Sequence, residues 1–172
     1  MNPEYFKVIF LILEVPDKWP ENFAIITASN PMDEKLSQEE NLWRNKKLLS
    51  KFGDNIFFPL SGCSPDFSHQ EQSFALKCSL EEGLEIGKEY NQRAIFYVKN
   101  DNLELLECKT AISHQLGKFS GRLFLRDQKS ASKLVFIDSG VIFGLHFGAP
   151  ERPKIEEFKI SSCLLYTSPS PR

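Results

Sequence analysis

The chain has 172 residues and a formal net charge of −2, and 41% of its residues are hydrophobic and 12% aromatic, with 15 Phe. This length suits one domain, or one domain and part of a second, and the apolar content predicts a folded core rather than disorder. The charge gives no basic face, so we expect no binding to duplex nucleic acid.

The first expected element is a strand over Tyr5–Val15, centred on the apolar run VIFLIL. Six apolar residues are too few to cross a bilayer. The run also lacks the basic start and the small-residue cleavage site of a secretory signal. We therefore expect a buried strand in a cytoplasmic protein that makes no contact with membranes.

A strand and a helix are expected next. Phe23–Ala28 is predicted to be a strand that ends at Asn30-Pro31, because proline disfavours helix at the residue before it. The sequence SQEE, from Ser37, is a capping box that starts a helix. This helix should run to about Phe52, where Gly53 stops it.

A second strand–helix unit follows. Asn55–Leu60 is expected to be a short strand, and Glu71–Cys78 a strand by its alternating pattern. A second capping box, SLEE, starts a helix that should run to about Tyr90. Gly83 and Gly87 lie one turn apart on it, and each costs about 1 kcal/mol of helix propensity relative to Ala. We expect close packing against a sheet to compensate.

A hairpin completes this part of the chain, with strands at Arg93–Lys99 and Leu103–Cys108 around Asn100-Asp101, residue types that tolerate positive φ. From Phe23 onward the expected order is strand, helix, strand, strand, helix, strand, which is the ferredoxin-like split βαβ arrangement. We therefore predict an α+β sandwich whose mixed sheet carries two helices on one face, with additional C-terminal β-strands.

Beyond Thr110 the segments GRLFLR, KLVFID and VIFGLHF have the composition of strands, with a tight turn expected at Asp138–Gly140. We predict an α+β domain over residues 1–110 and a β-rich extension, or a truncated second element, over residues 111–162. The last ten residues, CLLYTSPSPR (163–172), match the translation of a transposase-type sequencing adapter in full. We expect this tail to be an artefact and exclude it from the predictions.

The cysteines predict no metal centre. Cys63, Cys78, Cys108 and Cys163 form no C-x-x-C pair and no Cys/His cluster with zinc spacing. We expect reduced, structural thiols and no cofactor. The sequence also has no P-loop, no dinucleotide-binding glycine motif and no H-E-x-x-H motif.

One polar cluster lies on the first helix, where Asn41 and Asn45 occupy the N-terminal half of an otherwise apolar face. A buried amide without a partner costs about 1–3 kcal/mol, so both should bond to nearby groups. The nearest are Thr27 and Asn30 at the end of the preceding strand, and the free N–H groups of the helix start. The amides either tie down the loop over Ser29–Leu36 or line a small pocket that favours an anionic or amide-bearing ligand.

The sequence HQEQS places His69, Glu71 and Ser73 at alternate positions, as in a catalytic triad. Side chains on one face of a straight strand are about 6.7 Å apart, whereas triad members need hydrogen bonds of about 2.6–3.2 Å. We therefore expect no Ser-His-Glu hydrolase. Glu71 alone is a candidate general acid, general base or hydrogen-bond acceptor, with Arg93, Gln92 or an amide as its partner.

Four segments carry a recognisable pattern: IITASNP, LSQEENLWRNKKL, PDFSHQEQSF and GLEIGKEYNQRAIFYVKNDNLELL. The pattern is T-A-x-N-P, a helix opened by E-N with a second Asn, a loop into E-x-S, and a helix ending in Q-x-A-[IV]. Because it carries this pattern over about residues 23–107, the chain resembles an uncharacterised bacterial family, domain-of-unknown-function family 3293. The resemblance implies no activity. It does coincide with one candidate ligand pocket, made of Thr27, Asn30, Asn41, Asn45, Glu71, Ser73 and Gln92.

Three functions follow as hypotheses. The first is a small binding or regulatory module whose amide-rich pocket takes a small polar ligand or a peptide end. The second is an enzyme that uses Glu71 as general acid or base, with Ser73 and the amides orienting its substrate. The third is a protein–protein interaction module with an exposed apolar patch on the Phe-rich strands after Phe119.

Overall fold

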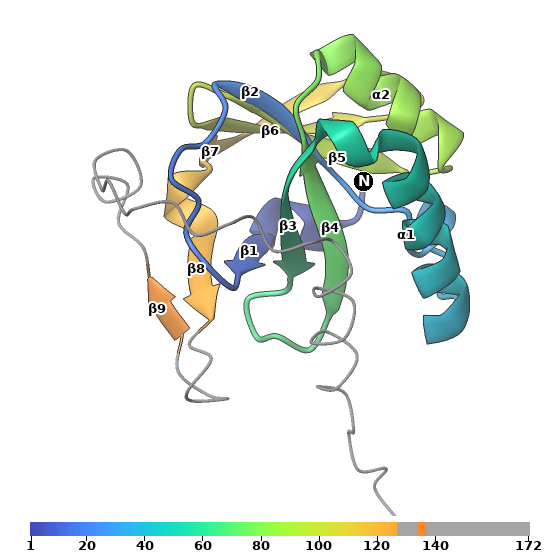
Figure 1. Ribbon diagram of the computed structural model, residues 1–172, viewed down its shortest axis with the longest axis horizontal. Coiled ribbons are helices and arrows are strands. Elements are labelled where there is room, and N and C mark those ends of the chain that lie inside the picture. Colours follow the sequence, from blue (N-terminus) through green and yellow to red (C-terminus); the bar gives the residue numbers. More distant parts are fainter. Residues whose placement is uncertain (127–133, 137–172) are drawn as a thin grey trace, which may run out of the picture.

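The computed structural model describes residues 1–126 and 134–136. Within these residues the chain forms two α-helices and one mixed sheet of nine strands (Figure 1). The elements are α1 (Gln38–Phe52), α2 (Leu80–Glu89), β1 (Ile9–Ile12), β2 (Asn22–Ile26), β3 (Ile56–Cys63), β4 (Gln70–Leu76), β5 (Ala94–Lys99), β6 (Asn102–Glu107), β7 (Ser113–Lys118), β8 (Leu123–Arg126) and β9 (Leu134–Phe136). Their order across the sheet is β7-β6-β5-β2-β4-β3-β1-β8-β9.

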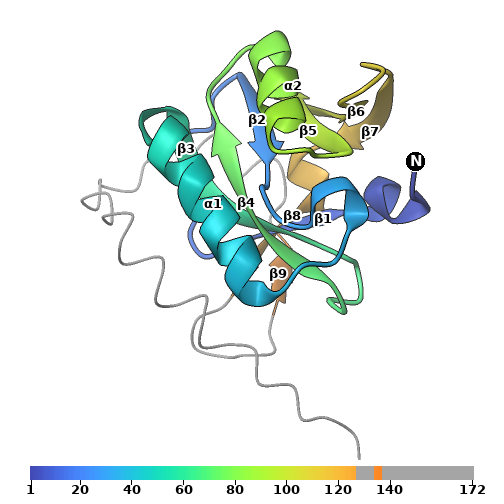
Figure 2. The ribbon, with the colours of Figure 1, turned by 90° about the vertical axis from the view of Figure 1, so that its right-hand side faces the viewer.

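The four strands β5, β2, β4 and β3 are neighbours at the centre of the sheet, and each adjacent pair is antiparallel. The parallel pair that makes the sheet mixed is β1 with β8. Helix α1 connects β2 to β3 and α2 connects β4 to β5, and both helices pack on the same face (Figure 2). The predicted α+β class, with a mixed sheet and two helices, is confirmed.

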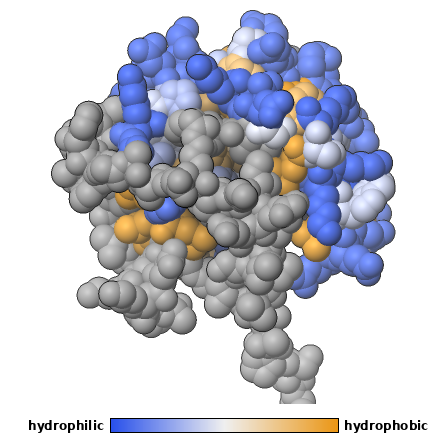
Figure 3. All heavy atoms as spheres, in the orientation of Figure 1, coloured by the Kyte–Doolittle hydropathy of each residue, from blue (hydrophilic) through white to orange (hydrophobic). Residues whose placement is uncertain are grey.

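Both helices start at the predicted capping boxes. The hydroxyls of Ser37 and Ser79 accept hydrogen bonds from the backbone N–H groups of Glu40 and Glu82, each at 3.2 Å. Each glutamate in turn accepts the backbone N–H of its serine. The outer surface over the two helices is mostly hydrophilic (Figure 3), as expected for helices with one buried face.

The two glycines of α2 allow the helix to lie directly on the sheet. A Cβ atom at Gly83 would lie 3.0 Å from the Cβ of Ala24, and one at Gly87 would lie 2.7 Å from both Ile95 Cγ2 and Cys108 Sγ. No side chain fits at such distances without a shift of its neighbours. The predicted close packing at these glycines is therefore confirmed.

The other face of the curled sheet encloses a second core, which is rich in aromatic rings. Phe10, Trp19, Phe23 and Phe119 are all buried. The ring centroids of Trp19 and Phe119 lie 4.9 Å apart, and those of Phe10 and Phe119 lie 5.5 Å apart. These tilted and edge-to-face contacts add to the apolar area that the core removes from water.

The side chain of Arg122 links two distant parts of the curled sheet. The guanidinium of Arg122 donates to the carbonyl of Leu116 on β7, at 3.0 and 3.2 Å. It also donates to the carbonyls of Phe6 and Val8, which precede β1, at 3.0 and 2.9 Å. The edge strand β7 is thereby linked to the N-terminal segment, and no short-range sequence pattern predicts this contact.

The N-terminal strand is shorter than predicted. Instead of a strand over Tyr5–Val15, the chain forms a 3₁₀ helix over Pro3–Lys7 and then β1. The side chain of Asn2 accepts the backbone N–H of Glu4 at 3.1 Å, and proline suits the first position of a helix because it lacks an N–H to satisfy. The Asn2 cap and Pro3 therefore favour a 3₁₀ helix at residues for which the apolar composition predicted a strand.

Two further boundaries differ from the predictions. Gly53 does not adopt a left-handed stop, because its φ is −54° and the chain continues into a 3₁₀ turn over Gly53–Asn55. Strand β3 runs past Leu60 to Cys63, which pairs with Gln70 at the start of β4. The connection between these strands is therefore shorter than the predicted strand ends at Leu60 and Glu71 imply.

After Thr110 the chain continues the same sheet. Strand β7 pairs with β6 and was not predicted, because SHQLGK has no alternation of apolar residues. Strands β8 and β9 lie within the predicted segments GRLFLR and KLVFID. The segment VIFGLHF, the turn at Asp138–Gly140 and the adapter-like tail lie outside the described residues. The division of the chain at residue 110 stays a prediction.

Candidate functional site

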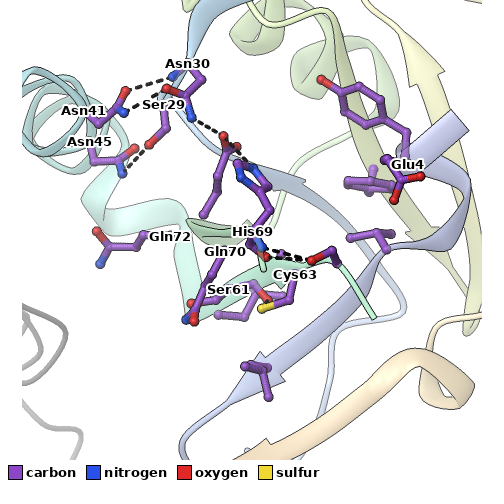
Figure 4. A pocket seen from close by; sticks show the side chains of 18 of the residues that line it. Glu4, Ser29, Asn30, Asn41, Asn45, Ser61, Cys63, His69, Gln70 and Gln72 are labelled. Carbon is purple, nitrogen blue, oxygen red and sulfur yellow. Dashed lines mark hydrogen bonds and ion pairs between the residues drawn. The ribbon is translucent and has the colours of Figure 1, made fainter. Parts of the chain in front are cut away.

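A groove of about 940 Å³ opens where the loop between β2 and α1 meets the ends of β3 and β4 and the N-terminal 3₁₀ helix (Figure 4). Five of the seven predicted pocket residues line it: Asn30, Asn41, Asn45, Glu71 and Gln92. Tyr5, Leu60 and Phe96 supply apolar parts of its lining.

Helix α1 directs two amides from its first turns at the end of β2, and both point toward Ser29 and Asn30 in Figure 4. The buried Asn45 accepts the backbone N–H of Ala28 at 3.0 Å and donates to Ser29 Oγ at 3.2 Å. Asn41 accepts the backbone N–H of Asn30 at 2.8 Å and donates to its Oδ1 at 2.9 Å. Both amides thus bond to the chain as it leaves the sheet.

Asn30 connects this amide network to the groove. Its backbone is left-handed, with φ 44° and ψ 61°, a conformation that Asn tolerates better than most residues. Its Oδ1 accepts the backbone N–H of Leu36 at 3.1 Å, and its Nδ2 donates to Glu71 Oε1. The buried Gln92 donates to the Ser29 carbonyl at 3.0 Å and supports the same segment.

The two hydroxyl residues of the predicted pocket lie elsewhere. Thr27 Oγ1 accepts the backbone N–H of Ser29 at 3.0 Å, and Ser73 Oγ donates to the Glu71 carbonyl at 3.3 Å. Neither is part of the groove lining. Each hydroxyl forms a hydrogen bond to the backbone two residues away.

Glu71 has two partners, and both bind the same carboxylate oxygen. Besides the Asn30 amide, His69 Nε2 lies 3.2 Å from Oε1. The expectation that His69 and Glu71 cannot touch is therefore wrong: His69 precedes β4, so strand spacing does not hold the two side chains apart. Among the described residues Oε2 has no hydrogen-bond partner, and the side chain is 22% exposed.

The remaining suggested partners of Glu71 are used differently. Arg93 pairs with Asp33 and donates to the Met32 carbonyl at 3.1 Å. Gln92 supports Ser29, as described above. Of the suggested partners, only an amide bonds to Glu71.

The loop between β2 and α1 is strained and firmly held. Asn30, Met32 and Asp33 have φ values of 44°, 52° and 66°. Such conformations cost non-glycine residues of order 1 kcal/mol or more and persist only where the surroundings fix them. Here Met32 N donates to the Asn91 carbonyl at 2.9 Å, and Arg93 donates to the Met32 carbonyl at 3.1 Å.

Three side chains of this region, Tyr5, Asp33 and Arg44, make long-range contacts that no sequence pattern predicted. Tyr5 donates its hydroxyl to Asp33 Oδ1 at 2.5 Å. Burial, and then this hydrogen bond, raises the pKa of the Tyr5 phenol well above its ordinary value, so the hydroxyl stays protonated. Arg44 donates to the carbonyls of Ala28 and Tyr90, both at 2.6 Å, and so joins the end of β2 to the end of α2.

The electrostatics of the helix start argue against an anionic ligand. The Glu40 carboxylate already accepts the Ser37 backbone N–H at 3.0 Å, and Glu39 lies beside it in the first turn. Asp33 and Glu71 add negative charge to the groove. These carboxylates disfavour an anionic ligand, and the choice between the two predicted ligand types stays a prediction.

The fold and the groove define an α+β protein with a groove whose lining includes the amides of Asn30, Asn41, Asn45 and Gln92. A family model described as "Protein of unknown function (DUF3293)" matches residues 26–95. The chain therefore resembles this family over the segment that contains all seven predicted pocket residues, as the sequence pattern indicated. No curated protein and no solved structure matches the chain. In the part of the chain that the structure describes, no helix is long and apolar enough to cross a membrane.

Proposed function

We propose that this protein is a small binding module whose groove takes a small polar ligand. The observation that carries the proposal is the Glu71 carboxylate, which Asn30 and His69 hold by one oxygen while the other has no described partner. A groove of about 940 Å³ has the size of typical small-molecule sites.

The strained loop supports the same proposal. Left-handed non-glycine residues cluster at ligand sites, where their geometry presents side chains that a relaxed loop would not. In this chain the loop carries Asn30 and Asp33 to the groove, and the amides of Asn41 and Asn45 fix it from α1. We assign these two amides to the support of the site and the ligand contacts to Glu71 and its neighbours.

The scaffold we propose is a ferredoxin-like split βαβ sandwich extended at both edges. The antiparallel order β5-β2-β4-β3, with α1 and α2 as crossovers on one face, supports it. Cys78 and Cys108 form no disulfide, which suits a reducing compartment, so we propose a cytoplasmic location, in a bacterium as the family resemblance implies.

A thermal-shift screen of nucleotides, amino acids, amines and sugars tests the binding proposal. We expect one class to raise the Tm of the wild-type protein, because a ligand that binds only the folded state stabilises it. Glu71→Gln should abolish that shift. The matched control is Glu107→Gln, since Glu107 also pairs with a histidine but lies outside the groove. A screen without any stabilising class, or a shift that Glu71→Gln retains, would contradict the proposal.

An enzyme is the second candidate, and the His69–Glu71 contact favours it. A carboxylate that orients an imidazole is a common acid–base arrangement. For any ligand that the screen finds, we expect an enzyme to convert it and His69→Gln to stop conversion while binding persists. Unchanged ligand after long incubation with wild-type protein would leave binding as the sole function.

The third hypothesis gains no support in the described part of the chain. Phe119 and Leu123 are buried there. The large apolar side chains that are exposed lie elsewhere, at Met1, Phe6, Val15, Trp43 and Ile112.

A further inference from the structure

The charged side chains around the groove indicate which kind of ligand it suits. Its charged lining residues are Glu4, Asp33, Lys35 and Glu71, with His69 as a titratable neighbour. Three carboxylates against one lysine make the lining acidic. The question is which of these charges is already compensated within the protein.

Two of the three carboxylates have cationic partners. Glu4 pairs with Lys7 at 3.1 Å. Asp33 pairs with Arg93 and also accepts the Tyr5 hydroxyl. The charge and the hydrogen-bonding capacity of Asp33 are therefore used within the chain, whereas the Glu4 side chain is 58% exposed and mainly solvated.

Glu71 differs from both. Its partners are the neutral amide of Asn30 and His69, whose side chain is 64% exposed. Among the described residues no lysine or arginine pairs with Glu71, and its Oε2 atom accepts no hydrogen bond. This oxygen is also not sealed from solvent. Glu71 thus offers a fixed, partly desolvated acceptor, and a cationic donor gains most from such a group.

The groove also has a place for the body of such a ligand. Tyr5 and Phe96 both line it, and their ring centroids lie 6.4 Å apart. Aromatic faces attract cations and the methylene groups next to them. Within the described residues no group of His, Cys, Asp and Glu side chains is arranged to hold a metal ion, so an organic cation suits this lining better.

We propose that the ligand is a small organic molecule with a protonated amine that donates to Glu71 Oε2. This inference rests on the proposed binding function and specifies its ligand class. The amine donates one hydrogen bond to Oε2, and its apolar body lies against Tyr5 and Phe96. Among the described residues Lys35 is the only lysine or arginine of the lining, and it favours an amino acid, which also carries a carboxylate, over a simple amine.

Four matched probes test the proposal by calorimetry at neutral pH: phenethylamine, L-phenylalanine, N-acetyl-L-phenylalanine and 3-phenylpropionate. We expect the first two to bind and the last two, which lack a free amine, to bind at least tenfold more weakly. Tighter binding of L-phenylalanine than of phenethylamine, lost in Lys35→Gln, would identify an amino acid as the source. Equal binding of the two would identify a simple amine.

Two variants decide whether Glu71 is the acceptor. Glu71→Gln keeps an oxygen for the Asn30 amide, so the fold should survive, but amine affinity should fall at least tenfold. Glu107→Gln should bind as the wild type does. Equal binding of 3-phenylpropionate, or full affinity in Glu71→Gln, would overturn the amine assignment. If the broader screen finds a neutral or anionic ligand instead, the binding proposal stands and the amine is wrong; if nothing binds, both fail.

Discussion

Two His–Glu pairs on one sheet have nearly the same contact geometry and very different surroundings. His69 Nε2 lies 3.2 Å from Glu71 Oε1, and His114 Nε2 lies 3.3 Å from Glu107 Oε1. The two carboxylates are 22% and 24% exposed. The first pair lies in the groove, whereas the second lies where β6 pairs with β7, outside the groove.

The difference lies in the second donor of each carboxylate. Glu107 takes a hydroxyl from Thr110, three residues away, at 2.9 Å. This local bond, followed by that to His114, holds the pKa of the Glu107 carboxyl below its ordinary value. Glu71 takes its amide from Asn30, which belongs to the strained loop and the network on α1. A His–Glu contact by itself is therefore no sign of function, and our proposal for Glu71 depends on the network that holds its carboxylate.

The largest expected loss of stability comes from removing an amide of the network that positions the loop next to Glu71. Asn45→Ala leaves the buried N–H of Ala28 without a partner, so the free energy of unfolding should fall by about 2–3 kcal/mol. Urea denaturation measures this. The control is Asn102→Ala at the start of β6, whose exposed amide should matter by less than about 0.5 kcal/mol. Similar losses in both variants would remove the distinction between the two regions.

The second effect separates backbone strain from hydrogen bonding at Asn30. Asn30→Gly removes the amide but tolerates the left-handed backbone, and should cost about 1–2 kcal/mol in unfolding free energy. Asn30→Ala should cost about 1 kcal/mol more, because alanine is strained at positive φ.

Asn100 is the matched control for this prediction. It lies in the β5–β6 hairpin at φ 47°, and its side chain makes no hydrogen bond among the described residues. Asn100→Gly should therefore change stability by less than about 0.5 kcal/mol. An Asn30→Gly variant as stable as this control would mean that the amide network contributes nothing.

Local patterns predicted much of the fold. Both capping boxes, the α2 glycines and the hairpin turn at Asn100-Asp101 depend on residues within one or two turns of each other, and all are present. The 3₁₀ helix over Pro3–Lys7 and strand β7 were missed, because composition does not distinguish a capped turn from a strand, nor a polar edge strand from a loop.

The site was predicted only in part, for a related reason. Helix periodicity and the family pattern identified Asn41 and Asn45. The Tyr5–Asp33 bond joins residues 28 positions apart, and its formation depends on the curl of the sheet and on a strained loop. Strand spacing argued against the His69–Glu71 contact, but β4 begins only at Gln70, so the side chain of His69 is free to reach Glu71.

A smaller effect concerns the titration of His69. The hydrogen bond to Glu71 raises the pKa of the His69 imidazole above its ordinary value, against the opposing effects of partial burial and Lys35. Glu71→Gln should therefore lower this pKa, as followed by the NMR shifts of the ring protons. Glu107→Gln should leave the pKa of His69 unchanged. A change of equal size in both variants would show that the two pairs are not independent.

The smallest effect is the pH dependence of stability that this pair contributes. Because the pKa of His69 is raised in the folded state, its contribution is present below the unfolded pKa, about 6.5, and is lost as pH rises through the folded pKa. The side chain is 64% exposed, so solvent screening limits the gain to about 0.3 kcal/mol. Denaturation at about pH 5.5 and pH 8 should show that difference between wild type and His69→Gln only at the lower pH. In a Glu71→Gln background the difference should vanish at both pH values, because the raised pKa arises chiefly from Glu71; if it persists, another group stabilises the imidazolium.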